Sequence, residues 1–189
     1  MANANNPFGF RPLIKMGGGP FSVRSYGKAA ADANPIYAFD LVGHLTGGTP
    51  FPLPENPTYN LSRIQSATQL TPGTSLYLGA SLSYGAASVG TVHPVADEVD
   101  CIFLTQCSGA TSITTAATAG LNANVLNTLS VLLTKMSQMQ LNSAGIASTS
   151  SLDLRVIEIA KISPNIEGAN AIVEVLINKH AFGQQTAGS

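Results

Sequence analysis

The stretch SLDLRVIEIAKISPNIEGANAIVEVLINKHAFG, residues 151–183, decides the fold, because two long runs typical of β-strands lie on either side of a turn. In the first run Leu152, Leu154 and Val156 alternate with polar residues, which is the period-two pattern of a half-buried strand. The apolar phase then slips by one residue at Ile157. Such a slip exchanges the buried face for the exposed one, so the sequence predicts a β-bulge or a strand that changes sheets here.

The turn and the return run complete this predicted hairpin. Pro164 fixes one backbone angle and Gly168 frees another, which is typical of a turn. The return run places apolar residues at every second position: Ala171, Val173, Val175 and Ile177. Because its other face is also partly apolar, we expect this run in the middle of a sheet.

Further runs with the strand pattern occupy residues 36–46, 75–82, 89–93 and 98–107. The sequence therefore predicts an all-β fold. We expect the core to consist of the strands at residues 98–107, 152–161 and 170–179. Residues 125–141 are ambiguous, because their apolar side chains fit helical spacing, and both a helix and a strand stay open there.

The chain is expected to form one β-rich core domain, residues 36–183, with an extended N-terminal arm, residues 1–35, and a flexible C-terminal tail, residues 184–189. Proline and a triple glycine in the arm resist helix and central strand. Deletion of residues 2–16 is therefore expected to leave the fold nearly as stable. The large side chains of the arm either pack on their own domain or reach a neighbouring molecule, and the low charge favours the second. The candidate assembly contacts are Phe8, Phe10, Arg11, Leu13 and Phe21.

Charge is scarce in this sequence. Of its 189 residues, 10% are charged, where a typical soluble domain carries about 25%. The net charge of −1 and the scattered Lys and Arg residues argue against a direct nucleic-acid partner. A surface with so little charge does little to keep copies apart, so we expect a homo-oligomer, a trimer or alternatively a dimer. Neither a signal peptide nor an apolar run of about 20 residues is recognisable, so we expect a soluble protein made in the cytoplasm, with no membrane partner.

Motifs that carry chemistry are missing: there is no G-x-S-x-G elbow, no P-loop and no G-x-G-x-x-G. We therefore expect a protein that is not an enzyme and holds no cofactor or metal. His44, His93 and His180 stand apart, so each is expected to be held by local hydrogen bonds. Cys101 and Cys107 would lie about 20 Å apart along one strand, too far for a disulfide, so we expect buried free thiols.

Asp97, Glu98 and Asp100 form the one acidic cluster of the sequence. On a strand, Glu98 and Asp100 would point the same way about 7 Å apart, which could hold Ca²⁺ between copies of the protein or support paired-carboxylate catalysis. A solvated patch at a turn is the alternative interpretation.

The opening ANANNPFGFRP, residues 2–12, resembles the start of a group of tailed-bacteriophage virion proteins. These are small cement (decoration) proteins encoded beside the major capsid protein. Shorter segments that look like the same group lie at residues 93–97, 101–103, 154–157 and 177–182. The resemblance implies an antiparallel β-barrel or a jelly-roll-like sandwich without catalytic residues. It also implies loop and strand in the segment that matches residues 121–141.

The function implied by this resemblance is that of a structural virion protein. Such a protein binds the outer surface of the phage capsid, with the major capsid protein as its partner, and stabilises the mature shell. Two other classes stay open. One is a phage tail or head–tail connector component, and the other is a small-ligand-binding β-barrel.

Overall fold

The structure, a computed structural model, describes residues 3–28, 30, 32–44, 51–53, 56–61, 64–66, 72–73, 75–127 and 134–183.

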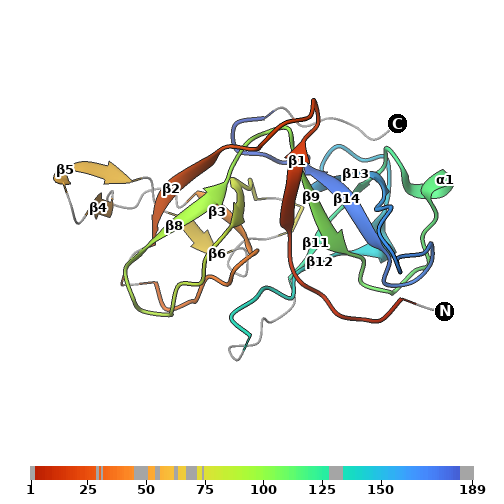
Figure 1. Cartoon of the computed structure of the whole chain (residues 1–189), viewed down its shortest axis with the longest axis horizontal. Coiled ribbons are helices and arrows are strands. Elements are labelled where there is room, and N and C mark those ends of the chain that lie inside the picture. Colours follow the sequence, from red (N-terminus) through yellow and green to blue (C-terminus); the bar gives the residue numbers. More distant parts are fainter. Residues whose placement is uncertain are drawn as a thin grey trace.

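Two five-stranded antiparallel sheets make up most of the fold (Figure 1). Sheet A has the strand order β1-β9-β14-β13-β10, with the bounds Arg11–Lys15 (β1), Cys101–Gln106 (β9), Ile172–Ile177 (β14), Leu154–Ile159 (β13) and Asn122–Ala123 (β10). Sheet B has the order β2-β8-β7-β3-β6, with the bounds Val23–Lys28 (β2), Thr91–Ala96 (β8), Gly79–Ser81 (β7), Leu41–His44 (β3) and Ile64–Ser66 (β6).

Smaller elements complete the described chain. Two further antiparallel pairs join Phe51–Leu53 (β4) to Asn56–Leu61 (β5), and Val125–Leu126 (β11) to Gln140–Leu141 (β12). A single helical turn, α1, spans Thr115–Thr118, and a 3-10 turn spans Ser143–Gly145. None of the helices in the described ranges is long and apolar enough to cross a membrane.

The fold class is therefore all-β, with antiparallel sheets packed together as a sandwich. The main core joins the inner face of sheet A, represented by Phe103, Val156 and Val175, to Leu41 and Ala80 of sheet B. A second cluster lies in sheet B and consists of Tyr26, Ile36, Val42, Ile64, Leu78 and Val95. The strands that the structure describes close no barrel, so the sandwich is the correct alternative of the two forms expected.

The two sheets are joined at a corner where two chain segments cross side by side. β1 leads into β2 through residues 16–22, and β8 leads into β9 through residues 97–100. Because β1 pairs with β9 while β2 pairs with β8, the two segments form one antiparallel ribbon that bends from sheet A into sheet B (Figure 1).

The three core strands expected from the sequence are confirmed as β9, β13 and β14, which are adjacent in sheet A. The phase slip at Ile157 is confirmed as a β-bulge, because the register between β13 and β14 shifts between Val156 and Glu158. On either side of the shift, Val156 and Ile159 face the core opposite Val175 and Val173. One extra residue thus restores the buried face that the slip would have lost.

The N-terminal arm is a correction, because most of residues 11–28 belongs to the two sheets. β1 and β2 form edge strands, and Phe10 is 0% exposed in the main core. Pro12 is tolerated because an edge strand leaves one side of its backbone unpaired. Gly18 and Gly19, with φ of 82° and 89°, make the turn after β1 and do not act as a joint in an extended arm.

Of the helix and the strand left open for residues 125–141, the structure shows short strands where it describes the chain. β11 and β12 occupy the two ends of this segment, and residues 134–139 between them carry no helix. Residues 128–133 lie outside the described residues, as does the C-terminal tail at 184–189.

Candidate assembly surface

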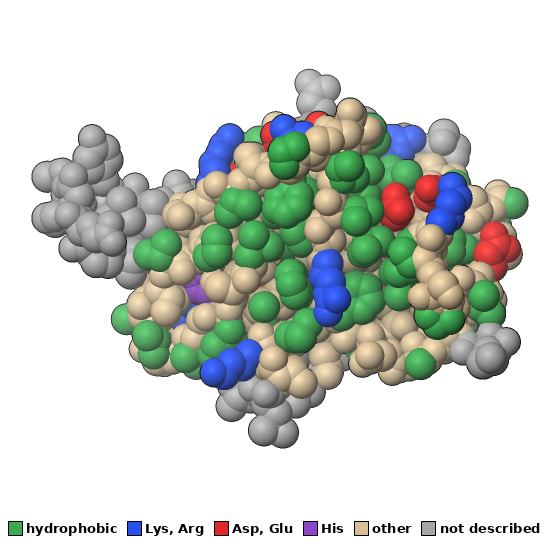
Figure 2. Space-filling model, in the orientation of Figure 1, with side chains coloured by type: hydrophobic (Ala, Val, Ile, Leu, Met, Phe, Trp, Pro, Cys, Tyr) green, Lys and Arg blue, Asp and Glu red, His purple; other side chains and the backbone are tan. Residues whose placement is uncertain are grey.

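The outer face of sheet A is broad and mainly uncharged. Its residues alternate along each strand with those of the core, and strand register brings them together. The apolar members are Ile14 on β1, Ile102 and Leu104 on β9, and Ile172 and Leu176 on β14. Figure 2 shows hydrophobic side chains gathered over β1, β9 and β14, with charged side chains scattered among them. We call this surface the outer face.

One row of cross-strand partners crosses the outer face. Its members, in strand order, are Arg11, Leu104, Glu174 and Glu158. Lys161 forms an ion pair with Glu158 at 2.7 Å. No ion pair and no side-chain hydrogen bond joins Glu174 to another described residue. Burial raises the pKa of Glu174, and the neighbouring Glu158 carboxylate raises that pKa further.

Arg11 lies at the opposite end of this row. Its guanidinium carbon is 4.7 Å from the centre of the Phe8 ring and 5.3 Å from that of Phe39. These stacking contacts orient the guanidinium, but it forms no ion pair with an acidic residue in the described part of the chain. The row therefore has a positive end and a negative end.

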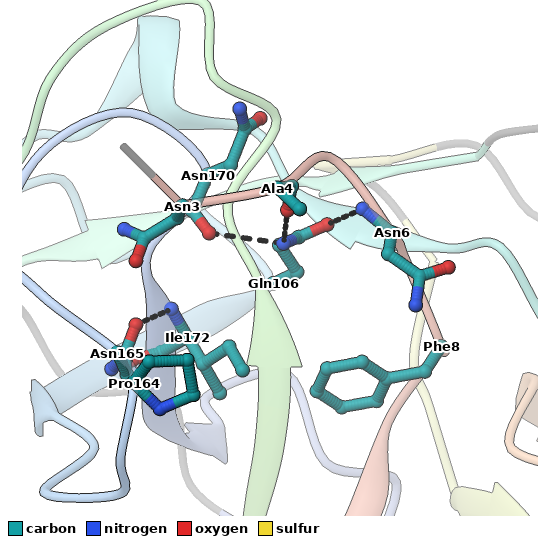
Figure 3. A pocket seen from close by; sticks show the side chains of 9 residues that line it. All are labelled: Asn3, Ala4, Asn6, Phe8, Gln106, Pro164, Asn165, Asn170 and Ile172. Atoms are coloured by element: carbon teal, nitrogen blue, oxygen red, sulfur yellow. Dashed lines mark hydrogen bonds between the residues drawn. The ribbon is translucent and has the colours of Figure 1, made fainter. Parts of the chain in front are cut away.

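Residues 3–8 cross one end of the outer face, where Gln106 holds them (Figure 3). The Gln106 Nε2 donates to the carbonyl oxygens of Ala4, at 2.8 Å, and Asn170, at 3.0 Å. Its Oε1 accepts the backbone N–H of Asn6 at 2.9 Å. Gln106 thus stabilises the N-terminal segment through both ends of one buried carboxamide.

A cleft of about 390 Å³ lies between this segment and the β13–β14 connection. Figure 3 shows the Phe8 ring on one side of the hollow and Pro164 and Ile172 on the other. Carboxamides line the rest: Asn3, Asn6, Gln106, Asn165 and Asn170. The cleft therefore combines apolar walls with neutral hydrogen-bonding groups and has no charged side chain in its lining.

Most of these carboxamides already bind the chain itself. Asn165 donates to the carbonyl oxygens of Ala160 and Ile172 and accepts the Ile172 N–H. Asn3 donates to Ile166 and accepts its N–H. Within the described residues, the side chain of Asn6 has no such bond, so it alone combines a free amide with a place beside the Phe8 ring.

The five assembly contacts expected from the sequence fall into three environments. Arg11 is exposed and Leu13 is 45% exposed, both on β1. Phe8 is half-buried at the cleft, and Phe21 is half-buried against the main core. Phe10 is a correction, because its complete burial in its own core leaves no surface for another molecule.

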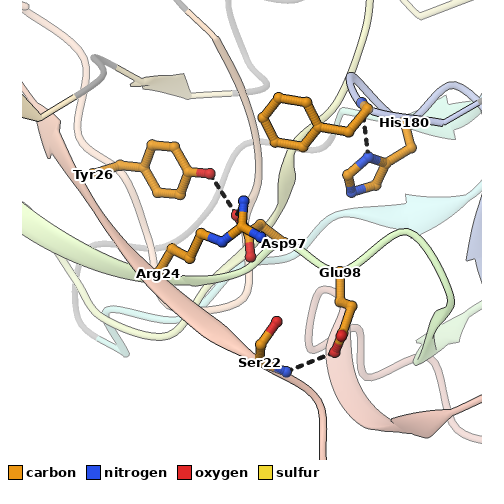
Figure 4. Close-up of polar contacts among 7 residues, drawn as sticks. Ser22, Arg24, Tyr26, Asp97, Glu98 and His180 are labelled. Atoms are coloured by element: carbon orange, nitrogen blue, oxygen red, sulfur yellow. Dashed lines mark hydrogen bonds and ion pairs between the residues drawn. The ribbon is translucent and has the colours of Figure 1, made fainter.

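Asp97 does not form a shared acidic site with its neighbours. Its carboxylate is buried, accepts the Tyr26 hydroxyl at 2.5 Å and lies 3.6 Å from the Arg24 guanidinium (Figure 4). Burial raises the pKa of Tyr26, and the hydrogen bond to Asp97 raises it further. Asp97 therefore fastens β2 to the end of β8.

Glu98 is also taken up by protein donors. It forms an ion pair with Lys15 at 2.5 Å. It also accepts the Ser22 N–H at 2.7 Å (Figure 4). The hydrogen bond from Lys15 lowers the pKa of Glu98, and the Ser22 N–H lowers it further. Asp100 is exposed. The described ranges hold no group of three His, Cys, Asp or Glu side chains placed for a metal ion. Asp97 and Glu98 instead stabilise the corner through these contacts.

Large apolar side chains are exposed around this corner. Met16 is 56% and Phe182 is 60% exposed, and Val23 and Val99 are also exposed. Met16 donates its N–H to the Asp100 carbonyl beside Val99, and a Cβ on Gly183 would lie 3.0 Å from the Val99 side chain. We call Met16, Val23, Val99 and Phe182 the corner patch.

The histidines and cysteines behave as structural residues where they are described. His93 is buried among the Ser81, Ser83 and Thr91 hydroxyls, and burial lowers its pKa to about 4. Cys101 and Cys107 are free and buried, as expected, and burial raises the pKa of each thiol to about 12. His180 is buried too and accepts the Phe182 N–H, whereas the side chain of His44 lies outside the described residues.

The sequence left two features of this surface unrecognised. The row on the outer face depends on cross-strand register, and the corner patch joins residues 16, 23, 99 and 182 from four places in the chain. For the second, the available signal was isolated apolar residues in or beside the connections between predicted strands. Comparisons of the chain with protein-family models, with curated proteins and with solved structures gave no match.

Proposed function

We propose that this chain is a structural virion protein of a tailed bacteriophage, which binds the outer surface of the capsid as a cement protein. It acts by binding and not by catalysis. Its partner is the major capsid protein, and its place is the capsid surface.

The observation that carries this proposal is the corner patch. Met16 and Phe182 are the two most exposed large apolar side chains of the described residues, and they flank a corner that ion pairs hold firm. Burial of an apolar side chain in a partner contributes roughly 1.5–3 kcal/mol before the ordering costs are subtracted. A rigid corner that presents several such side chains is suited to a fixed site on a protein lattice.

The neutral surface supports a repeated, low-cost contact. With 10% charged residues, little charge has to be desolvated when the surface is covered. An icosahedral shell presents the same site many times, so an oligomer can use several weak contacts at once through effective concentration. A protein that binds only the assembled shell then stabilises that shell by mass action.

The experiment is co-sedimentation of the full chain with purified expanded shells of the phage that encodes it. Substitution of Val99 and Phe182 by Asn should abolish sedimentation, while the melting temperature stays within a few degrees of the original. Ile162→Asn is the matched control, because Ile162 is as exposed as Val99 and lies on the β13–β14 connection. No sedimentation of the unmodified chain, or equal loss in the control, contradicts the proposal. If antibodies against the chain label only the tail of the virion, the tail or connector alternative is supported.

The cleft favours a second candidate function, the binding of a small neutral ligand. Its apolar walls and carboxamides, including the free amide of Asn6, are suited to a hydroxyl-rich ligand such as a sugar. A screen of neutral saccharides by NMR, with Asn6→Ala and Phe8→Ala as variants, tests this. Chemical-shift changes confined to the cleft and lost in both variants would support it, and their absence would remove it.

A further inference from the structure

We propose that the outer face of sheet A is the interface of a two-fold symmetric dimer, in which Arg11 of each copy meets Glu174 of the other. The occupant of this face is thus a second copy of the chain. This inference stands independently of capsid binding, because the corner patch, and not this face, carries the proposed function.

The strand register gives the symmetry. Arg11 and Glu174 are both paired with Leu104, one on each side of β9. They are therefore about 10 Å apart, two strand spacings, with Leu104 at the midpoint. A two-fold axis in the contact plane, parallel to β9 and over Leu104, places β1 of one copy on β14 of the other. Each Arg11 then faces a Glu174, as an isologous interface requires.

The neighbouring row fits the same axis. Ile14 pairs with Ile102 on β9. The pairing of β9 with β14 runs to Phe103 opposite Val175, so the next residue of β14, Leu176, lies level with Ile102. The two-fold axis that brings Arg11 of one copy opposite Glu174 of the other therefore also brings Ile14 of one copy opposite Leu176 of the other. Ile102 of one copy then lies opposite Ile102 of its partner copy. Apolar side chains meet apolar ones beside the two ion pairs, in a sandwich of sheets about 10 Å apart.

Electrostatics within one copy give the reason for a partner. Glu158 and Glu174 are direct cross-strand neighbours, which is unfavourable for like charges. Lys161 forms its ion pair with Glu158 and acts on Glu174 only as a weaker neighbouring charge, so half-buried Glu174 has no ion pair of its own within the described residues. Arg11 is exposed and has no acidic partner in the described part of the chain. A second copy supplies the missing charge at both positions, so the same contact satisfies both ends of the row.

The two copies contact each other through the outer face of sheet A and not through its edge. β1 is an edge strand, but Pro12 lacks an N–H and the register shifts between Pro12 and Ile14. Arg11 and Lys15 place charge on the same strand. These features hinder the pairing of β1 with a strand of another chain. In the two rows of the outer face that the dimer uses, between β1 and β14, the charged side chains are Arg11 and Glu174, which the dimer pairs with each other.

The size of the face sets the expected affinity. The axis over β9 brings three strands, β1, β9 and β14, onto their counterparts, and with about 4.8 Å spacing and about 3.4 Å per residue they give a footprint of about 300 Å². This is smaller than the roughly 800 Å² per partner of a standard interface. We therefore expect a dimer with a micromolar dissociation constant. From the sequence, a dimer is the alternative to the expected trimer.

The test is sedimentation velocity of the full chain from about 1 to about 200 µM, a range that brackets micromolar dissociation constants. The variants are Arg11→Glu, Glu174→Arg and the double charge swap. Each single reversal places two like-charged pairs in the dimer and should weaken dimerisation at least about tenfold. The double swap restores both pairs and should recover the original dissociation constant. Asp100→Arg, which changes net charge as Glu174→Arg does but lies at the corner, should leave dimerisation unchanged.

Folding does not confound this experiment. Arg11 is exposed, so Arg11→Glu loses only the stacking on Phe8 and Phe39 and should melt slightly below the original temperature. The new side chain of Glu174→Arg faces Glu158 within its own chain, so this variant should melt at or above the original temperature. A dimer lost in each reversal and recovered in the swap supports the inference. A monomer throughout, a trimer, a dimer insensitive to the reversals, or a swap that fails to recover it overturns the inference.

Discussion

Glu158 and Glu174 are direct cross-strand partners on the outer face of sheet A, and the β-bulge at Ile157 is what places them opposite each other. Without the extra residue, the register that pairs Val156 with Val175 would bring Ile157 opposite Glu174. The bulge keeps Ile159 in the core at the expense of two adjacent carboxylates. Keeping Ile159 buried on one face of the sheet thus places two like-charged carboxylates next to each other on the other face.

The first prediction concerns Glu174→Gln. The raised pKa means that the folded chain binds a proton more readily than the unfolded one, whose Glu has the ordinary value of 4.5. This carboxylate therefore costs stability as pH rises through the window above 4.5, and the cost persists at neutral pH. Removal of the charge should raise the free energy of unfolding at pH 7 by about 0.2–1 kcal/mol, as measured by urea denaturation.

Glu158→Gln is its matched control. It also removes one of the two like charges, but it loses the ion pair with Lys161, so its gain should be smaller. At a chain concentration well below the dissociation constant of the dimer, a loss of stability in Glu174→Gln at pH 7 would show that Glu174 has a favourable partner in the monomer.

The second prediction is that Gly79→Ala strongly destabilises sheet B. A Cβ at Gly79 would overlap the Ala96 carbonyl oxygen, where β7 and β8 approach closely. Because the obstacle is backbone, it cannot move aside, and we expect a loss of about 3 kcal/mol or more. Gly17→Ala has open space around the new methyl group and should be neutral or slightly stabilising. Equal melting temperatures for the two variants would contradict the close approach.

The third prediction replaces the expectation that residues 2–16 are dispensable for folding. Phe10 is completely buried in the main core, so Phe10→Ala should cost about 3–5 kcal/mol. Phe8→Ala, at a half-buried position beside Arg11, should cost clearly less. Thermal unfolding of both variants decides the matter, since an extended arm that is independent of the fold would make both changes nearly neutral.

The fourth prediction is a loss of stability on acidification. Burial lowers the pKa of His93 to about 4, below its ordinary value of 6.5. Between these values the unfolded chain binds a proton that the folded chain excludes, so stability falls as pH drops from 6.5 to 4. The loss from this group should reach about 3 kcal/mol. NMR titration should find the His93 imidazole neutral at pH 5 in the folded protein, whereas titration near 6.5 would contradict its burial.

The central sheet could be predicted from the sequence, because its signal is local. Alternation in residues 152–161 and 170–179 identifies β13 and β14, and the adjacent apolar pair at Val156 and Ile157 marks the bulge. A period of two needs no knowledge of neighbouring strands. The same reasoning identified β9 and the buried thiols of Cys101 and Cys107.

The N-terminal strands and the assembly surface could not be predicted in this way. β1 contains Pro12 and is followed by glycines, so its composition indicates an arm, yet an edge position tolerates both. The partners of β1 and β2 are about 60–90 residues away, and only the fold reveals that Arg11 and Glu174 share a row. The surface depends on strand register and topology, and neither can be derived from a single sequence.

The central claim, that this chain is a capsid cement protein, is tested most directly by counting its copies in virions. Quantitative mass spectrometry of purified virions of the encoding phage measures its ratio to the major capsid protein. We predict a fixed ratio that matches a repeated site on the shell, retained after the tails are removed. Absence of the chain from purified virions, or a few copies that leave with the tails, would contradict the claim.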